Sequence, residues 1–304
     1  MDTAIKERKL LISVCIATYK REAQLEKLLK SLYDQELHEK ILLEIIVTDN
    51  NAEQSAREVV ERFERNDKIK LKYFAQPEKN ISLTRNVCVI NATGDYLCFI
   101  DDDETADRNW VQSFYYAIKK YSADGAFGYV EPVFDKRIPV NLQKREYYFS
   151  PVCKTGSTAK FYFTTNAIVK ASFIKTENGP FDPAYGLTGG EDVHLFERLE
   201  KKGARFIDCK EAKTFEFIPI ERGNLKYLFN RAQRGGQSYI RRKLEFNHNL
   251  LFRLWVLLKA LIQIVYNSIK IILRIFSRNP NTIINIGASI GKIRSIFKKY
   301  KKLY

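Results

Sequence analysis

Short apolar runs alternate with helical patterns over the first 130 residues, and this alternation limits the folds that the chain can adopt. The runs that predict strands are Leu10 to Ala17, Leu42 to Thr48, Ile69 to Phe74, Tyr96 to Ile100 and Ala126 to Val130. The segments between them, including 24–37 and 55–65, carry apolar residues at helical spacing. Strands that alternate with helices are typical of a doubly wound, mostly parallel sheet with helices on both faces. We therefore expect an α/β fold.

The second half of this pattern begins after an irregular stretch. Residues 131–165 are rich in proline and aromatic residues and predict an excursion over the surface, where an acceptor could bind. The α/β pattern then resumes with strands predicted at 166–170, 205–208 and 213–218 and a helix at 191–202. A further helix carries Arg231 and Arg234.

The charge of the chain is concentrated at its C-terminal end. The net charge is +15, yet residues 222–304 hold 18 Lys and Arg against one acid, Glu245. The preceding residues are close to neutral, and the 45% hydrophobic content is enough for a substantial core. A near-neutral body with a basic end implies an anionic partner, either a membrane surface or nucleic acid.

The basic end also has the pattern of an amphipathic helix. Polar residues recur at helical spacing among apolar ones, at Lys259, Gln263, Asn267, Lys270 and Arg274. Such a stripe, with Trp255 and Tyr266 nearby, suits a helix that lies in a membrane interface, and the basic cluster at 292–302 would add attraction to anionic lipid. A helix that covers a core and a solvated, disordered end are the simpler interpretations.

Cysteine usage and the N-terminus indicate the compartment. The five cysteines are odd in number and form no C-x-x-C pair, which favours reduced thiols in the cytosol. The apolar run at 10–16 is short and lacks a cleavage pattern, so we interpret it as the first strand instead of a signal peptide.

Three adjacent carboxylates, Asp101, Asp102 and Asp103, follow directly after the apolar run at 96–100. The carboxyl ends of strands in open α/β sheets are where ligands bind. Like charges this close repel one another, and hard oxygen ligands suit Mg²⁺ or Mn²⁺. We therefore predict a divalent cation here, completed by substrate phosphates; an acidic cap on the helix that follows is the structural alternative.

Four segments taken together resemble the family 2 glycosyltransferases of GT-A fold. They are Ser13 to Arg21, Glu44 to Asn51, Ile81 to Asn86 with the Asp triplet, and Thr188 to Asp192. The resemblance covers roughly residues 10–240 and is specific as a set, although none of the motifs is specific alone. It implies a doubly wound, mixed sheet in a catalytic domain over 1–221 and a helix at 222–248 that completes the active site. The charge and the amphipathic pattern add the expectation of a basic, membrane-associating tail at 249–304.

The resemblance also implies how a nucleotide-sugar is held. Asp103 is the expected metal ligand, and Asp101 is expected to contact the metal or the ribose. The other residues expected at the nucleotide are Thr18, Tyr19, Arg21, Asp49, Arg85 and Asp102. Ala17, Lys20 and Asn80 depart from common residues of the family, which affects the identity of the donor more than the reaction class.

Catalytic roles follow from the same resemblance. Asp192 is the expected general base, with Glu191 as the second choice, although acidic residues are also common in a first helical turn. Arg231 and Arg234 resemble arginines that clamp the leaving diphosphate. Arg234 is followed by two glycines instead of the tryptophan of processive synthases, which favours addition of one sugar per encounter.

The function implied is a metal-dependent, inverting glycosyltransferase of hexosyltransferase type. It would move a sugar from a nucleotide-sugar, with UDP-sugar preferred, to a lipid-linked or polysaccharide acceptor during assembly of bacterial lipopolysaccharide, capsule or exopolysaccharide. We expect a peripheral location at the cytoplasmic side of the inner membrane, with an anionic membrane surface and no nucleic acid as partner. The oligomeric state stays open.

Two other functions remain as alternatives. Asp101, Asp103 and Thr105 also fit the Asp-x-Asp-x-Thr motif of haloacid-dehalogenase-like phosphohydrolases. A non-catalytic protein that binds nucleic acid or membrane would explain the basic end but not the carboxylates. A dinucleotide-binding enzyme is disfavoured because no G-x-G-x-x-G follows a strand.

Overall fold

The computed structural model describes residues 8–64, 69–177, 179–273 and 279–300. Within these ranges one sheet of eight strands has the order β3-β2-β1-β4-β7-β6-β8-β5. The strands are β1 (Leu10–Thr18), β2 (Ile41–Asp49), β3 (Lys70–Ala75), β4 (Tyr96–Ile100), β5 (Glu104–Ala106), β6 (Gly125–Phe134), β7 (Asn166–Lys170) and β8 (Phe206–Ile218).

The strand directions divide the sheet into two parts. β1 pairs parallel with β2 and β4, and β2 pairs parallel with β3. β7 is antiparallel to both β4 and β6, and β5 is antiparallel to β8. The sheet is therefore mixed, as the family resemblance implies, and the mostly parallel sheet expected from the alternation alone is wrong. Only the first four strands in the order have the parallel pairing that βαβ units produce.

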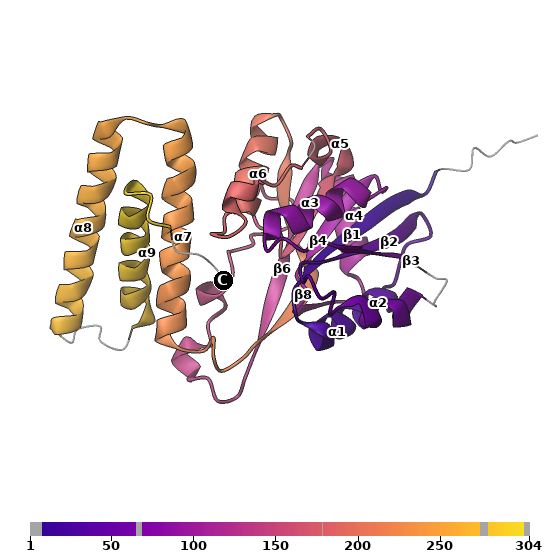
Figure 1. Ribbon diagram of the computed structural model, residues 1–304, viewed down its shortest axis with the longest axis horizontal. Coiled ribbons are helices and arrows are strands. Elements are labelled where there is room, and N and C mark those ends of the chain that lie inside the picture. Colours follow the sequence, from indigo (N-terminus) through magenta and orange to yellow (C-terminus); the bar gives the residue numbers. More distant parts are fainter. Residues whose placement is uncertain (1–7, 65–68, 178, 274–278, 301–304) are drawn as a thin grey trace, which may run out of the picture. The chain divides into compact units, whose positions relative to one another are not determined.

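The helices of this part of the chain cover both faces of the sheet. They are α1 (Glu22–Tyr33), α2 (Arg57–Glu64), α3 (Ile81–Asn91), α4 (Trp110–Tyr121), α5 (Ala171–Ile174) and α6 (Glu191–Lys201). Short 3₁₀ turns occur at Val140–Leu142, Arg145–Tyr147 and Pro183–Tyr185. In Figure 1, α3 and α6 lie on one side of the sheet and α1 and α2 on the other.

Alternation along β1 builds the two cores. Ile12, Val14 and Ile16 belong to the apolar cluster that contains the buried residues of α1, α2 and α4. Cys15 points to the other face, where it joins the cluster formed with α3, α5 and α6. Because successive side chains of a strand point to opposite faces, a strand buried on both sides becomes a nearly continuous apolar run. This is why the sequence pattern located the strands.

The chain divides into two compact units. The first consists of residues 1–132, 150–183 and 191–216, and the second of 133–149, 184–190 and 217–304. The sequence-based boundaries at 221 and 248 do not coincide with this division, because residues 133–149, a part of the excursion predicted at 131–165, and the segment 184–190 group with the C-terminal helices.

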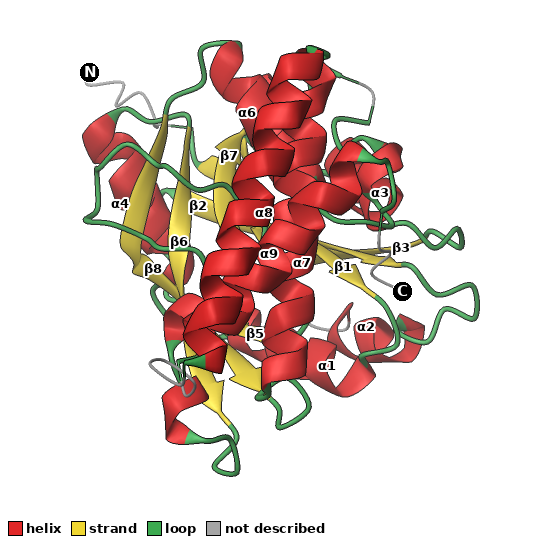
Figure 2. Cartoon of the chain, turned by 90° about the vertical axis from the view of Figure 1, so that its left-hand side faces the viewer, coloured by secondary structure: helices red, strands yellow, loops and turns green. Residues whose placement is uncertain are grey.

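The described residues of the second unit form three long helices, α7 (Leu225–Phe246), α8 (Leu250–Ile272) and α9 (Pro280–Ile296). α9 packs against both α7 and α8 and lies between them in Figure 1; Figure 2 shows the three helices overlapping when they are viewed from the side of α8. A Cβ added at Gly236 or Gly291 would lie about 2 Å from a backbone oxygen of the facing helix, at 2.1 and 1.9 Å respectively. α7 and α9 therefore approach each other more closely than side chains at these two positions would allow.

Several expectations change here. The strands predicted at 205–208 and 213–218 are one continuous strand, β8, and neither β5 nor α9 was predicted. The polar stripe of α8 faces α9 in part, since Asn267 is buried and Gln263 Oε1 accepts a hydrogen bond from Ser289 Oγ at 3.0 Å. Arg274, the last residue of that stripe, lies outside the described residues.

Candidate active site

The carboxyl ends of three parallel strands bring the predicted residues to one edge of the sheet. Thr18 ends β1 and pairs in register with Asp49, which ends β2. β4 lies on the other side of β1 and ends at Ile100, so that the Asp triplet begins where β4 stops. The first unit thus carries its acidic run at a strand end, where α/β sheets bind ligands.

Asp102 points into the protein and joins the ends of β1 and β4. Its side chain accepts hydrogen bonds from Thr18 Oγ1 at 2.8 Å and from Arg21 Nη1 at 2.7 Å. Asp102 is 4% exposed, and burial raises its pKa to about 6 although Arg21 opposes the rise. Asp102 was predicted at the nucleotide; in this structure its contacts fix the position of Thr18 and Arg21, a role that the sequence did not indicate.

Arg21 also forms an ion pair with a second carboxylate, that of Asp103. Its Nη1 atom lies 3.0 Å from Asp103 Oδ2 in addition to its contact with Asp102. Burial would lower the pKa of Arg21, but the carboxylates of Asp102 and Asp103 outweigh it and raise the pKa above its usual range. One guanidinium therefore neutralises two of the three adjacent acids.

Arg85 links the Asp triplet to the start of α6. Its guanidinium donates to Glu191 Oε1 at 2.5 Å and to Asp101 Oδ1 at 3.3 Å. Burial would lower the pKa of Arg85, but Glu191 and Asp101 raise it above its usual range. The sequence predicted Arg85 beside the nucleotide; the structure gives it two protein carboxylates as partners.

The two acids that open α6 differ in environment. Glu191 is buried, its Oε2 atom has no hydrogen-bond partner, and burial raises its pKa to about 7 against the opposing charge of Arg85. Asp192 is half-buried, and its Oδ1 atom accepts from the backbone N–H of Val193 at 2.7 Å. Of the two, Asp192 is therefore the more accessible to an incoming molecule, and Glu191 is the one held by an arginine.

The Asp triplet suits a divalent cation that takes further ligands from a substrate. The side chains of Asp101 and Asp103 are 34% and 16% exposed, and both offer hard carboxylate oxygens. In the part of the chain that the structure describes, no three His, Cys, Asp or Glu side chains form a closed metal cage. Mg²⁺ and Mn²⁺ need only one or two carboxylates when phosphates complete their shell, so the donor set fits such an ion.

Asp49 and Tyr19 lie at the same strand ends with different surroundings. Asp49 is fully buried and accepts hydrogen bonds from the backbone of Asn51 at 2.8 Å and Ala56 at 2.9 Å and from the Tyr73 hydroxyl at 3.1 Å. The Tyr19 ring is half-buried, and the ammonium of Lys79 lies 4.9 Å from its centroid. Asp49 thus fixes the loop after β2, and its predicted contact with the nucleotide stays a prediction.

Arg231 and Arg234 both belong to α7, in the second unit. The guanidinium of Arg231 donates to the backbone oxygen of Tyr148. Burial lowers the pKa of Arg234, and the neighbouring cations Arg231 and Arg222 lower it further. These three arginines form a cationic group that suits an anion, while their predicted role at a diphosphate stays a prediction.

The alternative of a phosphohydrolase fits the structure less well. Thr105, the third residue of the Asp-x-Asp-x-Thr pattern, lies on the short strand β5, which pairs with β8. Glu104 beside it is buried, and burial raises its pKa well above the usual range. The segment after the triplet therefore continues as a strand of the sheet.

Comparison with known proteins identifies the family. A model of the family described as glycosyl transferase family 2 matches residues 13–177, which include the Asp triplet. The succinoglycan biosynthesis protein ExoM of Rhizobium meliloti is 31% identical over 240 residues, which cover 79% of this chain and 77% of that protein. A β-1,3-glucosyltransferase of Campylobacter jejuni, which acts on GalNAc(5)-diNAcBac-PP-undecaprenol by its name, is 32% identical over 31% of this chain and 29% of its own length.

Solved structures show the same fold. The mannosyltransferase PcManGT of Pyrobaculum calidifontis, solved with GDP-Man and Mn²⁺, superposes with a TM-score of 0.65 at 18% identity and covers 96% of this chain and 89% of its own. Residues 1–349 of TarS from Staphylococcus aureus, solved with UDP, give a TM-score of 0.54 at 17% identity over 95% of this chain and 90% of that one. On the family match and the extent of the likeness to ExoM, the chain belongs to glycosyl transferase family 2 and is a glycosyltransferase of GT-A fold.

Proposed function

We propose that this glycosyltransferase is metal-dependent and inverting, and that it adds one sugar from a UDP-sugar to a lipid-linked or polysaccharide acceptor. The observation that carries the proposal is the chain of contacts from Asp101 through Arg85 to Glu191. It couples the acids proposed for the donor to the first turn of α6, which holds the proposed base. A donor and an acceptor hydroxyl bound at these two places would meet in one site.

The proposed chemistry assigns one step to each group. Asp192 removes the proton from the acceptor hydroxyl while the hydroxyl oxygen attacks the anomeric carbon of the donor. The bond between that carbon and the diphosphate oxygen breaks, and the diphosphate leaves with the bonding electrons. Attack from the face opposite the leaving group inverts the configuration. Asp192 is preferred to Glu191 because Glu191 is already held by Arg85.

A divalent cation would be held by Asp103, with Asp101 as a second ligand or a ribose contact. When bound, such an ion supplies positive charge that stabilises the departing diphosphate. Thr18, Tyr19, Arg21 and Asp49 would surround the base and ribose. Arg231 and Arg234 would contact the diphosphate, since guanidinium binds phosphate oxygens in pairs and stays charged.

Binding of nucleotides tests the donor and metal parts of this proposal. Calorimetry with UDP, GDP and dTDP should give Mn²⁺-dependent binding of UDP, and Asp103→Asn should lose that dependence. Asp107→Asn is the matched control, because Asp107 is a nearby acid outside the triplet, whose Oδ1 atom accepts a hydrogen bond from the backbone N–H of Asn109 at 3.0 Å. Equal UDP binding with and without metal by well-folded protein would contradict the metal role.

Turnover of matched variants tests the base. Asp192→Asn should reduce transfer by about 10²- to 10⁴-fold, the usual contribution of a general base, with donor affinity unchanged. Glu191→Gln should mainly weaken stability and donor binding, because it removes a partner of Arg85. If Asp192→Asn turns over at the normal rate, Asp192 is not the base.

We also propose that the enzyme binds the cytoplasmic face of the inner membrane through α8, and that its product belongs to lipopolysaccharide, capsule or exopolysaccharide. α8 is long and apolar enough to cross a membrane, with a mean hydropathy of 1.5, and 17% of its most apolar 18-residue window is buried. Its apolar side chains on the face away from α9 are exposed, including Leu254 at 52% and Leu258 at 59%. The basic residues of the C-terminal region would add attraction to anionic lipid.

Vesicle binding tests this surface. Leu254→Gln combined with Leu258→Gln should release the protein from anionic vesicles, while Val140→Gln, which changes another exposed apolar side chain, should not. Substitution is preferable to deleting 249–304, because deletion would also remove α9 from its contact with α7. Unchanged sedimentation of the double variant with vesicles would contradict the role of α8.

A further inference from the structure

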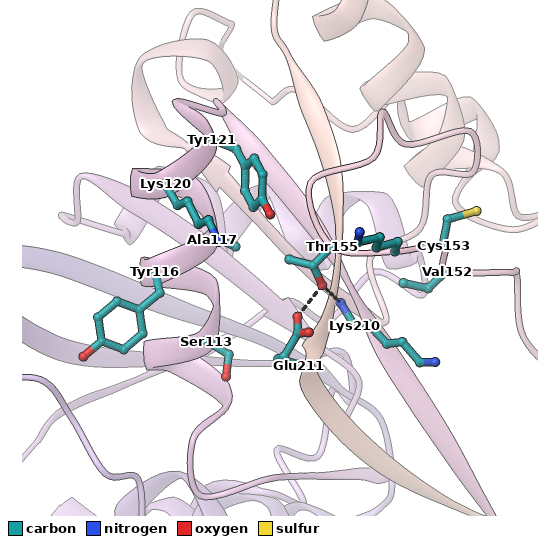
Figure 3. A pocket seen from close by; sticks show the side chains of 11 residues that line it. Ser113, Tyr116, Ala117, Lys120, Tyr121, Val152, Cys153, Thr155, Lys210 and Glu211 are labelled. Carbon is teal, nitrogen blue, oxygen red and sulfur yellow. Dashed lines mark hydrogen bonds between the residues drawn. The ribbon is translucent and has the colours of Figure 1, made fainter.

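The first unit contains a cavity that is formed by residues outside the proposed donor site. Its volume is about 690 Å³. It is lined by one face of α4, by the segment 152–155 and by Lys210 and Glu211 of β8, as Figure 3 shows. A volume of this size lies within the range of roughly 300–1,000 Å³ that is usual for sites of small ligands.

The wall formed by the segment 152–155 is fixed to β8. The backbone N–H of Cys153 donates to Asp208 Oδ2 at 2.8 Å, and that of Gly156 donates to the Asp208 carbonyl at 3.0 Å. Thr155 Oγ1 accepts from the backbone N–H of Lys210 at 2.9 Å and donates to Glu211; dashed lines mark both bonds in Figure 3.

Gly156 completes this wall. Its φ is +87°, and a Cβ there would lie 2.4 Å from the ring of Tyr121, at the end of α4. The loop therefore packs directly on α4, and only glycine has both the freedom and the size for this position. The cavity between α4, the loop and β8 is consequently built before any ligand arrives, which lowers the entropic cost of binding.

The net charge of the residues that line the cavity is positive. Lys120, Lys154 and Lys210 line it, and among the residues that the structure describes none of the three forms an ion pair. Glu211 is the one acid among the lining residues, and its carboxylate already accepts a hydrogen bond from Thr155. Several cations gathered at one concave surface attract an anionic ligand.

The remaining lining residues indicate what carries the anionic group. Tyr116 offers an exposed aromatic ring and Val152 offers aliphatic surface, whereas the Lys120 ammonium lies 5.4 Å from the centroid of the Tyr121 ring. Flat apolar surface beside charged and hydroxyl groups suits a sugar, which presents C–H groups on one face and polar groups at its edges. We propose that this cavity binds an anionic sugar, with a carboxylate or phosphate group, in a part of the acceptor glycan other than the sugar that reacts. The choice of a glycan rests on the proposed function.

The thiol of Cys153 can report whether a ligand occupies this cavity. Cys153 lines the cavity and is exposed, whereas the other four cysteines are buried. Ellman's reagent should therefore label one thiol in the folded full-length protein. We expect trigalacturonic acid or glucose 1-phosphate to slow this labelling by about fivefold or more at saturation, and neutral maltotriose to leave it unchanged. Protection by trigalacturonic acid would identify a carboxylate as the recognised group. Protection by glucose 1-phosphate would identify a phosphate.

Variants locate the effect. Combined Lys120→Gln, Lys154→Gln and Lys210→Gln should abolish protection, and added salt should weaken it in the natural sequence. Lys119→Gln is the matched control, because Lys119 is the neighbour of Lys120 on α4 but does not line the cavity. Protection that survives in the triple variant, or equal protection by maltotriose, would overturn the proposal.

The labelling assay separates this proposal from the proposed function. It needs neither a donor nor turnover, so protection by an anionic sugar supports the second site even if UDP fails to bind. Normal sugar transfer together with the absence of protection by both anionic sugars would overturn the second site alone.

Discussion

Replacing Arg85 by methionine should destabilise the first unit in a way that depends strongly on pH. The side chains of Arg85 and Glu191 are only 10% and 8% exposed. Methionine keeps most of the length of the side chain but leaves Glu191 without its cation. Breaking a buried ion pair from one side costs about 3–5 kcal/mol. For a unit of this size that corresponds to a fall in melting temperature of roughly 6–20 °C.

The dependence on pH follows from the protonation of Glu191. Its pKa is already about 7, above the ordinary 4.5, because it is buried, and it should rise further without Arg85. A carboxyl whose pKa is higher in the folded protein than in the unfolded one binds more protons when folded, so stability falls as pH rises between those two values. In Arg85→Met this fall should extend above pH 7.

The free energy of unfolding of Arg85→Met should therefore be closer to that of the natural protein in acid than in base. Near pH 5.5 the loss should shrink to about 1–3 kcal/mol, the cost of a buried neutral group without a partner. Thermal and urea unfolding of the full-length chain at about pH 5.5 and about pH 8.5 would measure both values.

Arg108→Met is the matched control for this measurement. Arg108 pairs with Glu36 at the surface, where the two side chains are 72% and 53% exposed, and loss of such a pair costs roughly 0–1 kcal/mol. The reasoning would be refuted if the free energy of unfolding lost in Arg85→Met were equal at both pH values, or no larger than that lost in Arg108→Met.

Two further predictions concern stability. Gly291→Ala should lower the melting temperature, because the new Cβ would lie 1.9 Å from a backbone oxygen of α7, whereas Gly235→Ala, with nothing within 4 Å, should be neutral or stabilise α7 by up to about 1 kcal/mol. Burial would raise the pKa of Glu44, but hydrogen bonds from Ser13, Lys72 and Thr93 lower it to about 2 from 4.5. The contribution of ionised Glu44 to the free energy of unfolding should therefore be complete above pH 4.5 and decline toward pH 2. In Glu44→Gln, the free energy of unfolding should no longer show this decline between pH 4.5 and pH 2.

The sequence predicted the sheet well where burial on both faces makes a strand continuously apolar. β4 and β7 occupy the predicted residues, and β1, β2 and β3 begin and end within one residue of the prediction. β5 was missed because Glu104–Ala106 is short and has no apolar run. β8 was divided in two because Lys210 and Glu211 are exposed in its middle and interrupt the apolar pattern.

α9 was missed for a different reason. It packs through glycine and serine, and its buried residues include Gly287, Ser289 and Gly291. Small residues allow a close approach of backbones but leave no hydrophobic signal in the sequence. A periodic stripe of small residues could have indicated this helix.

For the candidate site, the sequence predicted the location of the acids but not their partners. Three identical residues in a row give no sign of which carboxylate points inward, yet only Asp102 accepts from both Thr18 and Arg21. Likewise, nothing in the segment around Arg85 indicates that it meets Glu191, more than 100 residues later in the chain. Such choices depend on the packing of distant segments.

The position of β1 in the sheet has a consequence for how the protein is made. β1 lies between β2 and β4, and Ile12 pairs with Tyr96, so β1 waits for its second neighbour until more than 80 further residues have been synthesised. β4 in turn waits for β7, and β5 pairs with β8 across more than 100 residues. Pairings between distant strands make folding slow and leave apolar edges exposed meanwhile. Yield in a recombinant host should therefore improve with slow synthesis at low temperature.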